Sequence, residues 1–409
     1  MLRSICFVFM LLASIFFTSC KNNQAGEAIS ADFEKQMQEK LVNAKEGDVI
    51  ELPEGTFNLS RPLILDGIGN ITIRGKGMEK TILNFKGQKD GAEGLRITAN
   101  GIVLEDFAIK DAKGDCIKIQ DATNVTIRRV KSGWTAVHST SNGSYGLYPV
   151  ASTNVLIEDC EVYGSSDAGI YVGQSKNIIV RRNKVHDNVA GIEIENCTDS
   201  EVYENSSYNN TGGILVFDLP DLSIKNGMRC RVHNNKLYDN NTGNFGPKGT
   251  AVSEIPAGTG LIVMATNQCE IYANDITNHN SVSAAVVSYL IMRKPFKDSI
   301  YDPYCGGISI HDNKITRGTG SVDKSVALGK LMSAVFGDKI PDVIFDGSIN
   351  PAYRNTNGSV KEEQRICIKN NGDIHFANMD WEHNAKNIST DLSAFDCAIA
   401  GWNEVKINQ

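Results

Sequence analysis

The sequence has no excess of basic residues. Its 41 Lys and Arg are outweighed by 48 Asp and Glu, which gives the 409-residue chain a formal net charge of −7. Because phosphate binding depends on a basic surface, this balance excludes nucleic acid as the main partner. It does not exclude an acidic polysaccharide, since a basic cleft can be confined to one part of an acidic protein.

Several motifs are missing as well. The sequence contains no P-loop, no G-x-S-x-G nucleophile motif and no C-x-x-C-H motif for haem attachment. Nothing in it therefore indicates a phosphate-binding loop, an α/β-hydrolase or a covalently bound haem. Beyond the N-terminus, no apolar run approaches the ~18–20 residues that a membrane-spanning helix needs.

Ten cysteines are present, but no two have C-x-x-C spacing and no group of Cys and His residues has zinc-binding spacing. Cys6 and Cys20 belong to the N-terminal segment, and the positions of the others do not resemble a disulfide framework. Cys197, Cys230 and Cys269 each precede a strand-like run. This recurrence predicts buried thiols stacked at one position of a repeat, where they act as small hydrophobic side chains.

The first 20 residues have the pattern of an export signal. Arg3 provides a positive charge, residues 5–17 are apolar, and two small residues lead to Cys20. This ending resembles the lipobox of bacterial lipoproteins, except that Phe17 is bulkier than the usual Leu or Val. The sequence therefore predicts an exported protein that is lipid-anchored through Cys20 in the bacterial cell envelope, periplasmic or surface-facing. The alternative is a plain secretory signal with an incidental cysteine.

A repeat of about 22 residues runs through the middle of the chain. The run GIYVG at 169–173 is followed 22 residues later by GIEIE, then by GILVF at 213–217 and, after a longer loop, by GLIVM at 260–264. A second type of run interleaves with the first, at 124–127, 154–157 and 177–180. Each run alternates aliphatic with other side chains, which is the period of a half-buried β-strand.

Asparagine recurs at fixed offsets after these runs. One series is Asn183, Asn205, Asn235, Asn274 and Asn313, and a second is Asn188, Asn210 and Asn240. Asn tolerates left-handed backbone at a turn, and amides at one position of stacked strands can form a hydrogen-bonded ladder. Short strands, Gly and Asn turns and a coil of about 22 residues predict a solenoid with three strands per turn.

Stacked coils would form the core from inward columns of aliphatic side chains. One predicted column is Leu147, Ile170, Ile192, Ile214 and Leu261, and the next is Val172, Ile194, Val216 and Val263. Each such side chain contributes about 1.5–3 kcal/mol when it is buried.

The ends and the non-repeating parts set the predicted boundaries. Phe33, Met37 and Leu41 are spaced as one face of a helix, and Ser325 to Phe336 has an amphipathic pattern. The predicted segments are a signal peptide (1–20), a tether (21–30), an N-terminal cap helix (31–46), the solenoid (47–318), a helical or irregular insertion (319–360) and terminal strands that pack on the solenoid (361–409).

The segment Gly47 to Phe57 (GDVIELPEGTF), after a short amphipathic helix, resembles the start of pectate-lyase-like parallel β-helix proteins. The runs GLYPV, SDAGIYVGQS, GIEIEN and TGGILVFDLP resemble bacterial parallel β-helix repeat lipoproteins, and the resemblance covers residues 47–318. It implies an all-β fold, a right-handed parallel β-helix with three strands per turn, and a place in the cell envelope. For some such proteins the resemblance also implies a neighbouring periplasmic c-type cytochrome as a partner. It does not imply a reaction.

Side chains that alternate with the inward columns would face outward on one sheet. We predict a polysaccharide-binding groove there, formed by Trp134, Tyr148, Tyr171, Glu195, Phe217 and Asp218. Aromatic rings can stack on the C–H faces of sugars, and carboxylates accept hydrogen bonds from sugar hydroxyls. The long excursion at 131–144 would bring Trp134 and His138 near this face, and loops on a rigid scaffold often carry function. The alternative is a solvated sheet face, since tyrosine is common in strands.

A uronate lyase or C5-epimerase must remove the proton at C5 with a base and neutralise the adjacent carboxylate. The candidate catalytic residues are Lys118, His138, Tyr148, Tyr171 and Glu193. Glu193 and Glu195, two apart on one strand, could instead form the carboxylate pair of a glycosidase. Together with Asp218 they could also bind Ca²⁺, the one cofactor that the sequence indicates.

Two enzyme signatures of related folds are missing. The Asp-Pro-His-Asp string expected of an alginate epimerase is absent, with residues 302–305 (DPYC) as the nearest match, and so are the polygalacturonase motifs. Three hypotheses follow: a lyase or C5-epimerase acting on an acidic polysaccharide, a non-catalytic envelope protein that binds glycan or protein, and an accessory to a periplasmic redox system. A base and a carboxylate-neutralising group in one cleft would favour the first, and aromatic side chains alone the second.

Overall fold

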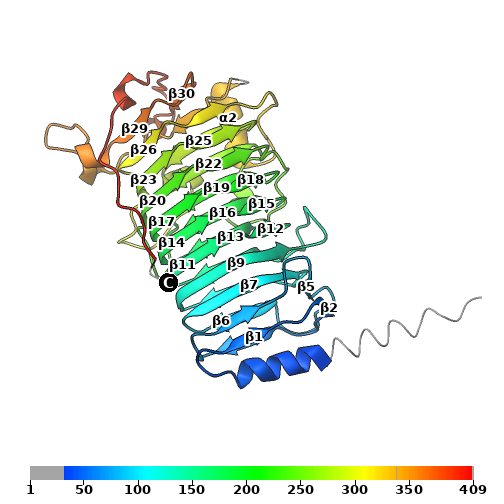
Figure 1. Ribbon diagram of the computed structural model, residues 1–409. Coiled ribbons are helices and arrows are strands. Elements are labelled where there is room, and N and C mark those ends of the chain that lie inside the picture. The colour runs from blue at the N-terminus through cyan, green and yellow to red at the C-terminus, as the bar shows by residue number, and fades with distance from the viewer. Residues whose placement is uncertain (1–31, 338, 408–409) are drawn as a thin grey trace, which may run out of the picture.

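The computed structural model describes residues 32–337 and 339–407. The chain winds as a stack of parallel coils, with three strands in each complete coil (Figure 1). The coil of β13 (Ala168–Gly173), β14 (Lys176–Arg181) and β15 (Lys184–His186) pairs strand for strand with β16 (Ala190–Glu195), β17 (Thr198–Tyr203) and β18 (Ser206–Tyr208). The predicted three-strand parallel β-helix is therefore confirmed.

The strands form three faces. The first face contains β3 (Leu63–Asp66), β6 (Leu95–Thr98), β8 (Ile117–Gln120), β10 (Tyr145–Val150), β13, β16, β19 (Gly212–Phe217), β22 (Thr259–Met264), β25 (Val282–Val287), β28 (Val343–Phe345) and β30 (Phe376–Asn378). The second contains β1 (Val49–Glu51), β4 (Thr72–Arg74), β11 (Thr153–Glu158), β14, β17, β20 (Met228–His233), β23 (Asn267–Tyr272), β26 (Ile308–His311) and β29 (Ile366–Lys369). The third contains β2 (Gly55–Asn58), β5 (Thr81–Asn84), β12 (Glu161–Tyr163), β15, β18, β21 (Lys236–Tyr238), β24 (Asp275–Thr277) and β27 (Lys314–Thr316). The long strands β7 (Ile102–Lys110) and β9 (Thr123–Gly133) pair with strands of both the second and the third face, so these two faces form one continuous sheet.

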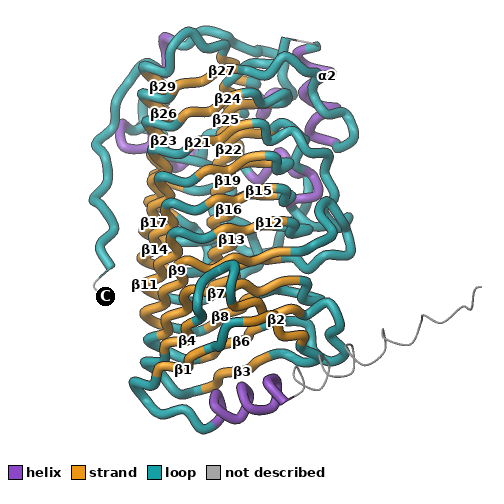
Figure 2. The backbone as a smooth tube through the Cα atoms, turned by 45° about the vertical axis from the view of Figure 1, so that its right-hand side comes forward, coloured by secondary structure: helices purple, strands orange, loops and turns teal. Residues whose placement is uncertain are grey.

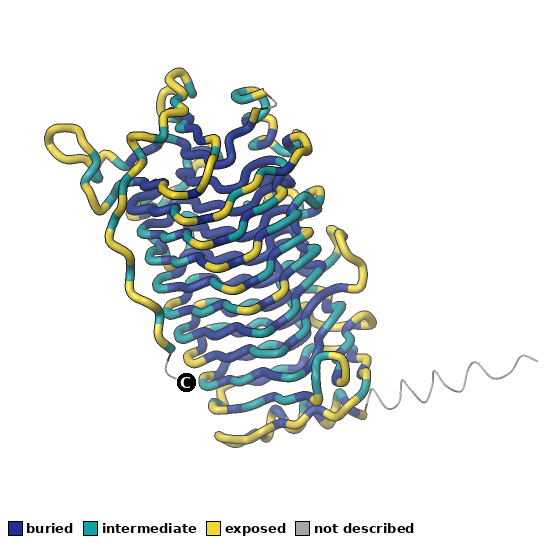
Figure 3. The backbone as a smooth tube through the Cα atoms, turned by 45° about the horizontal axis from the view of Figure 1, so that its top comes forward, coloured by how far each residue is buried: buried dark blue, intermediate teal, exposed yellow. Residues whose placement is uncertain are grey.

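Both predicted inward columns are confirmed. Ile192 is paired with Ile170 on one side and with Ile214 on the other, and all three side chains are completely buried. A single coil could not bury these side chains, because the coils above and below it close its interior on both sides. Figure 3 shows the result as buried backbone along the coils, with exposed segments at turns and in the terminal loops.

Truncation of a column residue should therefore destabilise the whole stack. We expect Ile192→Ala to lower the free energy of unfolding by about 2–5 kcal/mol, the range for shortening a buried aliphatic side chain. Ile300→Ala is the matched control, because Ile300 is 69% exposed. Chemical denaturation measures both, and equal midpoints for the two variants would contradict the inward register.

The asparagine ladder is also confirmed. Asn183 Nδ2 donates to Oδ1 of Asn205 (2.9 Å), and Asn205 Nδ2 donates to Oδ1 of Asn235 (3.0 Å). The series continues through Asn274 and Asn313 and ends on Asn371. The second series runs from Asn188 through Asn210 to Asn240 and ends on His279.

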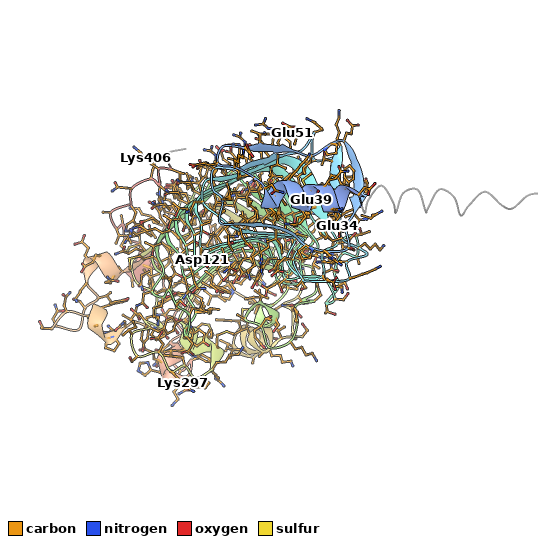
Figure 4. The ribbon with its side chains drawn as sticks, turned by 90° about the horizontal axis from the view of Figure 1, so that it is seen from below. Glu34, Glu39, Glu51, Asp121, Lys297 and Lys406 are labelled. Atoms are coloured by element: carbon orange, nitrogen blue, oxygen red, sulfur yellow. A yellow bond between two sulfur atoms is a disulfide. The ribbon has the colours of Figure 1, made fainter. Side chains whose placement is uncertain are left out.

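The N-terminal helix, residues 32–42, closes the first coil. Phe33, Met37 and Leu41 are buried, and the Phe33 ring stacks on Phe57 with centroids 3.8 Å apart. Figure 4 looks onto this end and shows the helix in front of the strands. The described residues contain no helix that is long and apolar enough to span a membrane. The predicted lipidation residue Cys20 lies outside the described residues.

The solenoid extends beyond residue 318, where the sequence repeat stops. β28 lies inside the predicted insertion yet pairs with β25, and β29 pairs with β26. The predicted boundary is wrong because coils with irregular connections still add strands in register. The predicted amphipathic helix is confirmed as α2 (Ala327–Phe336), which lies beside the upper coils (Figure 2).

Two cysteine predictions need correction. Cys367 and Cys397 form a disulfide, although the sequence spacing does not indicate one. Cys230 and Cys269 are paired in register and buried as predicted, but Cys197 is buried at a different position of the repeat, because the partner of Cys230 on β17 is Ser200. The three thiols therefore do not form one column.

A second apolar layer covers the upper part of the first face. It consists of residues 244–256 with the short helix η1 (Val252–Glu254), residues 289–301 with η2 (Tyr289–Met292), and α2. These segments bury outward side chains of β19, β22 and β25, among them Phe217. The lower strands β8 and β10 keep half-buried outward side chains. The predicted open face is thus open only at its lower part.

Candidate functional site

A cluster of tyrosines lies where the covered part of the first face meets the open part. Lys118 on β8 is paired with Tyr148 on β10, and Tyr171 on β13 is paired with Glu193 on β16. The rings of Tyr145, Tyr148 and Tyr171 contact one another, with centroids 4.5–5.0 Å apart. The Lys118 ammonium lies 5.2 Å from the centre of the Tyr148 ring.

Buried carboxyl groups adjoin these rings. Tyr171 donates its hydroxyl hydrogen to Oε1 of Glu195 at 2.6 Å, and Glu195 is hydrogen-bonded to Glu193. Asp167 is hydrogen-bonded to Tyr145. Gly173 makes this arrangement possible, because a Cβ atom there would lie 2.4 Å from the Tyr171 ring. We call Asp167, Glu193, Glu195 and the three tyrosines the tyrosine–acid cluster.

Burial controls the protonation of the cluster. It raises the pKa of Glu193 well above its usual range, and the neighbouring Asp167 and Glu195 raise it further. Burial also raises the pKa of Asp167 to about 8, with Glu195 adding to the effect. The pKa of Glu195 rises less, because Tyr171 and Glu193 donate hydrogen bonds to its carboxylate. Burial therefore favours the neutral, protonated forms of Glu193 and Asp167.

The tyrosines stay protonated and act as hydrogen-bond donors in this setting. Burial and the nearby carboxylates raise the pKa of Tyr145 and of Tyr171 well above 10, so both phenols keep their protons. On the exposed side, burial raises the pKa of Tyr148 to about 12. The cluster can donate hydrogen bonds to an anion through neutral acids and phenols, and Lys118 adds a positive charge.

The structure brings together four predicted catalytic residues, Lys118, Tyr148, Tyr171 and Glu193. The fifth, His138, lies on the 131–144 excursion, where its Nε2 is 3.0 Å from Oδ1 of Asp187 and its ring contacts Phe245. Phe245 belongs to the same apolar layer as Tyr171, so His138 borders the layer beside the cluster.

Five of the six predicted binding residues, Tyr171 and Glu195 among them, are buried, and only Tyr148 is half-buried. The Trp134 ring is buried in the main core, and its indole N–H donates to the carbonyl oxygen of Ala112. Phe217 is buried by the covering layer. Asp218 is completely buried, and burial raises the pKa of its carboxyl to about 7. For Phe217 and Asp218 the prediction failed because the covering segments have no counterpart in the repeat, and for Trp134 because its ring turns into the main core.

Neither alternative carboxylate role is decided by the contacts. Glu193 and Glu195 interact inside the buried cluster, and their use as the carboxylate pair of a glycosidase stays a prediction. Within residues 32–337 and 339–407, no three His, Cys, Asp or Glu side chains are grouped so that they could hold a metal ion. Calcium binding by Glu193, Glu195 and Asp218 stays a prediction.

Sequence reasoning missed Tyr145 and Asp167. Strict alternation places Tyr145 inward with Leu147, but Gly146 and Gly169 bend the chain at the strand starts. A Cβ on Gly169 would meet Val185 and Asn188 inside the coil, so the residues before these glycines turn outward. The recurring Gly before each inward aliphatic residue was the available signal.

Residues 93–289 match the family described as the right-handed β-helix region. The chain therefore folds as a right-handed parallel β-helix. No curated protein matches this β-helix in sequence. Its structure is similar to the Azotobacter vinelandii mannuronan C-5 epimerase AlgE4 A-module, with a TM-score of 0.51 and 17% identity over 71% of this chain and 85% of that one.

Two further solved structures share the β-helix less closely. An alginate lyase from Paenibacillus sp. has a TM-score of 0.41 and 16% identity over 70% of this chain and 94% of that one. DFA-IIIase from Arthrobacter chlorophenolicus has a TM-score of 0.49 and 12% identity over 79% of this chain and 89% of that one. At these identities the comparisons establish the fold alone.

Proposed function

We propose that this β-helix binds an acidic polysaccharide across β8, β10 and β13 and transfers protons there, as a lyase or C5-epimerase does. The observation that carries the proposal is the convergence of Lys118 with the tyrosine–acid cluster on one outward face. The A. vinelandii module is, by its title, a mannuronan C-5 epimerase, and this supports polyuronates as the first substrates to test.

The chemistry of the cluster fits a uronate. The C5 proton can pass to the Tyr171 oxygen while the Tyr171 hydroxyl hydrogen moves to the Glu195 carboxylate that it contacts. The negative charge left on the sugar carboxylate is stabilised by preorganised donors. Lys118 and neutral acids can supply positive charge and hydrogen bonds without adding the repulsion of ionised carboxylates. Tyr148, the half-buried phenol nearest to Lys118, is placed to meet the sugar ring and to return a proton.

A non-catalytic glycan-binding role is the second candidate, and burial favours it. Glu193 is only 2% exposed, and its Oε2 has no hydrogen-bond partner among the described protein atoms. If the acids stay out of reach of the sugar, Tyr148 and Lys118 would bind a glycan while the buried groups only shape the face.

Tyr148→Ala tests binding, and Glu193→Gln tests turnover. We expect Tyr148→Ala to weaken polyuronate binding by about 1 kcal/mol, roughly a fivefold rise in Kd, through the loss of ring contact. Glu193→Gln should abolish turnover with the fold intact, because the amide cannot deliver the proton. A panel of polyuronates, with and without Ca²⁺, is followed by calorimetry and by the ultraviolet absorbance of unsaturated products.

Tyr163→Ala is the matched control for binding, because Tyr163 is half-buried on the third face, where its ring stacks with His186. Binding without turnover in the unsubstituted protein, unchanged by Glu193→Gln, would favour the second candidate. Equal affinity of Tyr148→Ala and Tyr163→Ala for every polyuronate would reject this face as the binding site.

We also propose that the protein is exported and lipid-anchored through Cys20. The supporting observation is the lipobox-like ending of the N-terminal segment. Cys20→Ala should move the protein from the membrane fraction to the soluble fraction, as measured by fractionation and immunoblotting. Retention of the variant in membranes would show that acylation of Cys20 is not the anchor. An accessory role beside a periplasmic c-type cytochrome stays a prediction.

A further inference from the structure

A separate apolar cleft lies between the first face and α2, above the tyrosine–acid cluster. Its outer chamber has a volume of about 240 Å³ and is lined by Ile291, Met292, Arg293, Lys294, Leu328 and Leu331. Two smaller chambers of about 50 and 20 Å³ lie deeper, and both share Ile291 and Leu328 with the outer one. The chambers are therefore adjacent, with the aliphatic side chains of Ile291 and Leu328 lining all three.

The inner walls are apolar and adaptable. The deeper chambers reach Ile262 and Val287 on the outer face of the sheet. Four of the nine methionines in the sequence line the three chambers: Met264, Met292, Met332 and Met379. Methionine adapts its shape to different apolar partners and is favoured at surfaces that accommodate ligands.

The helix α2 forms one wall of the cleft. Its N-cap residue, Val326, makes no side-chain capping bond, and such a bond contributes about 0.5–2 kcal/mol to helix stability. The segment before the helix is fixed by Asp323, which accepts a hydrogen bond from the backbone N–H of Ala257. A small outward displacement of α2 would join the outer chamber to the inner ones.

The mouth of the cleft carries a net positive charge. Arg293 and Lys294 are exposed there, and Glu254 is the one acidic residue among those that line the outer chamber. The Arg293 guanidinium lies 4.8 Å from the centre of the Trp381 ring, which holds it beside the opening. An apolar interior with a cationic mouth is complementary to a molecule with an apolar tail and an anionic head.

We propose that this cleft binds a single-chain anionic amphiphile of the fatty-acid type, with its carboxylate at Arg293 and Lys294 and its chain beneath α2. The outer volume is below the roughly 300–1,000 Å³ of pockets that take drug-sized ligands, which favours one chain over a two-tailed lipid. None of the large exposed apolar side chains in the described residues lines the cleft, so the surface around it does not resemble a bilayer-binding patch.

Photo-crosslinking tests the proposal on the full chain as it is expressed. A diazirine-bearing dodecanoate is irradiated with the protein, and labelled peptides are mapped by mass spectrometry. Labels are expected in the peptides that contain residues 291–294 and 327–332. Ala327→Trp should reduce them at least tenfold, because Ala327 lines the outer chamber and a bulky ring would fill it. Ala334→Trp is the matched control, exposed on α2 and outside the lining.

Charge is tested in the same assay. The double variant Arg293→Glu, Lys294→Glu should lose most of the label, while Lys297→Glu, an exposed residue outside the lining, should keep it. A dodecylammonium probe should label these peptides weakly. Equal labelling by the two probes, labels spread over the surface, or full labelling of Ala327→Trp would each overturn the proposal.

Discussion

Asp167→Asn is expected to stabilise the protein at pH 8 and to flatten its stability profile. The unfolded chain loses the Asp167 proton near pH 4, whereas the folded protein keeps it up to a pKa of about 8. The folded state therefore binds more protons across this window, and stability falls as pH rises, by at most about 1.4 kcal/mol per pH unit. Asparagine has no such proton to lose and can retain the bond with Tyr145.

The measurement is chemical denaturation of the unsubstituted protein and the variant between pH 4 and pH 9. The free energies of unfolding of the two proteins should diverge progressively as the pH rises from 4, and the two curves should run parallel above pH 8. Asp121→Asn, an exposed acid on the loop after β8, should follow the unsubstituted protein throughout. If Asp167→Asn shows the same pH dependence as the unsubstituted protein, Asp167 is ionised in the fold, and the neutral-acid description of the cluster is wrong.

Asn205→Ala is expected to cost about 3–6 kcal/mol, because several buried groups lose their partners at about 1–3 kcal/mol each. Asn205 Oδ1 accepts from the backbone N–H and the side chain of Asn183, and its Nδ2 donates to the carbonyl oxygen of Val180 and to Asn235. All of these groups lie inside the coil, where water cannot replace the lost bonds.

Asn84→Ala is the matched control, because Asn84 donates to Asn58 at 2.8 Å in a similar amide pair at the exposed surface. Its loss should change the free energy of unfolding by less than about 1 kcal/mol, since water can satisfy the freed groups. Denaturation midpoints distinguish the two variants. A loss for Asn205→Ala no larger than for Asn84→Ala would mean that the buried ladder does not stabilise the stack.

The sequence was sufficient for the solenoid because each coil repeats the same local chemistry. Ile192 lies among aliphatic neighbours at one offset, and Asn205 recurs at another, so one coil predicts the next. The register follows from the strand period of two, and the confirmed pairing of Ile170, Ile192 and Ile214 shows that this argument holds along the stack.

The site was predictable only in part, because its environment comes from outside the repeat. The pairing of Tyr148, Tyr171 and Glu193 followed from registry, but the apolar layer that includes Tyr171 is built from residues that lie far along the chain. Periodicity cannot indicate such a covering layer. The Cys367–Cys397 disulfide was missed for a similar reason, since residue spacing alone does not establish which cysteines meet in space.

Proton exchange at C5 tests the proposed function most directly, because a lyase and a C5-epimerase both remove that proton. A polyuronate is incubated with the protein in D₂O, and its C5–H signal is followed by NMR. With the unsubstituted protein we expect the C5–H signal to disappear or to move to the chemical shift of the C5 epimer. With Glu193→Gln the original C5–H signal should persist. A C5–H signal that survives for every polyuronate tested, although the polymer binds, would contradict proton transfer at the tyrosine–acid cluster.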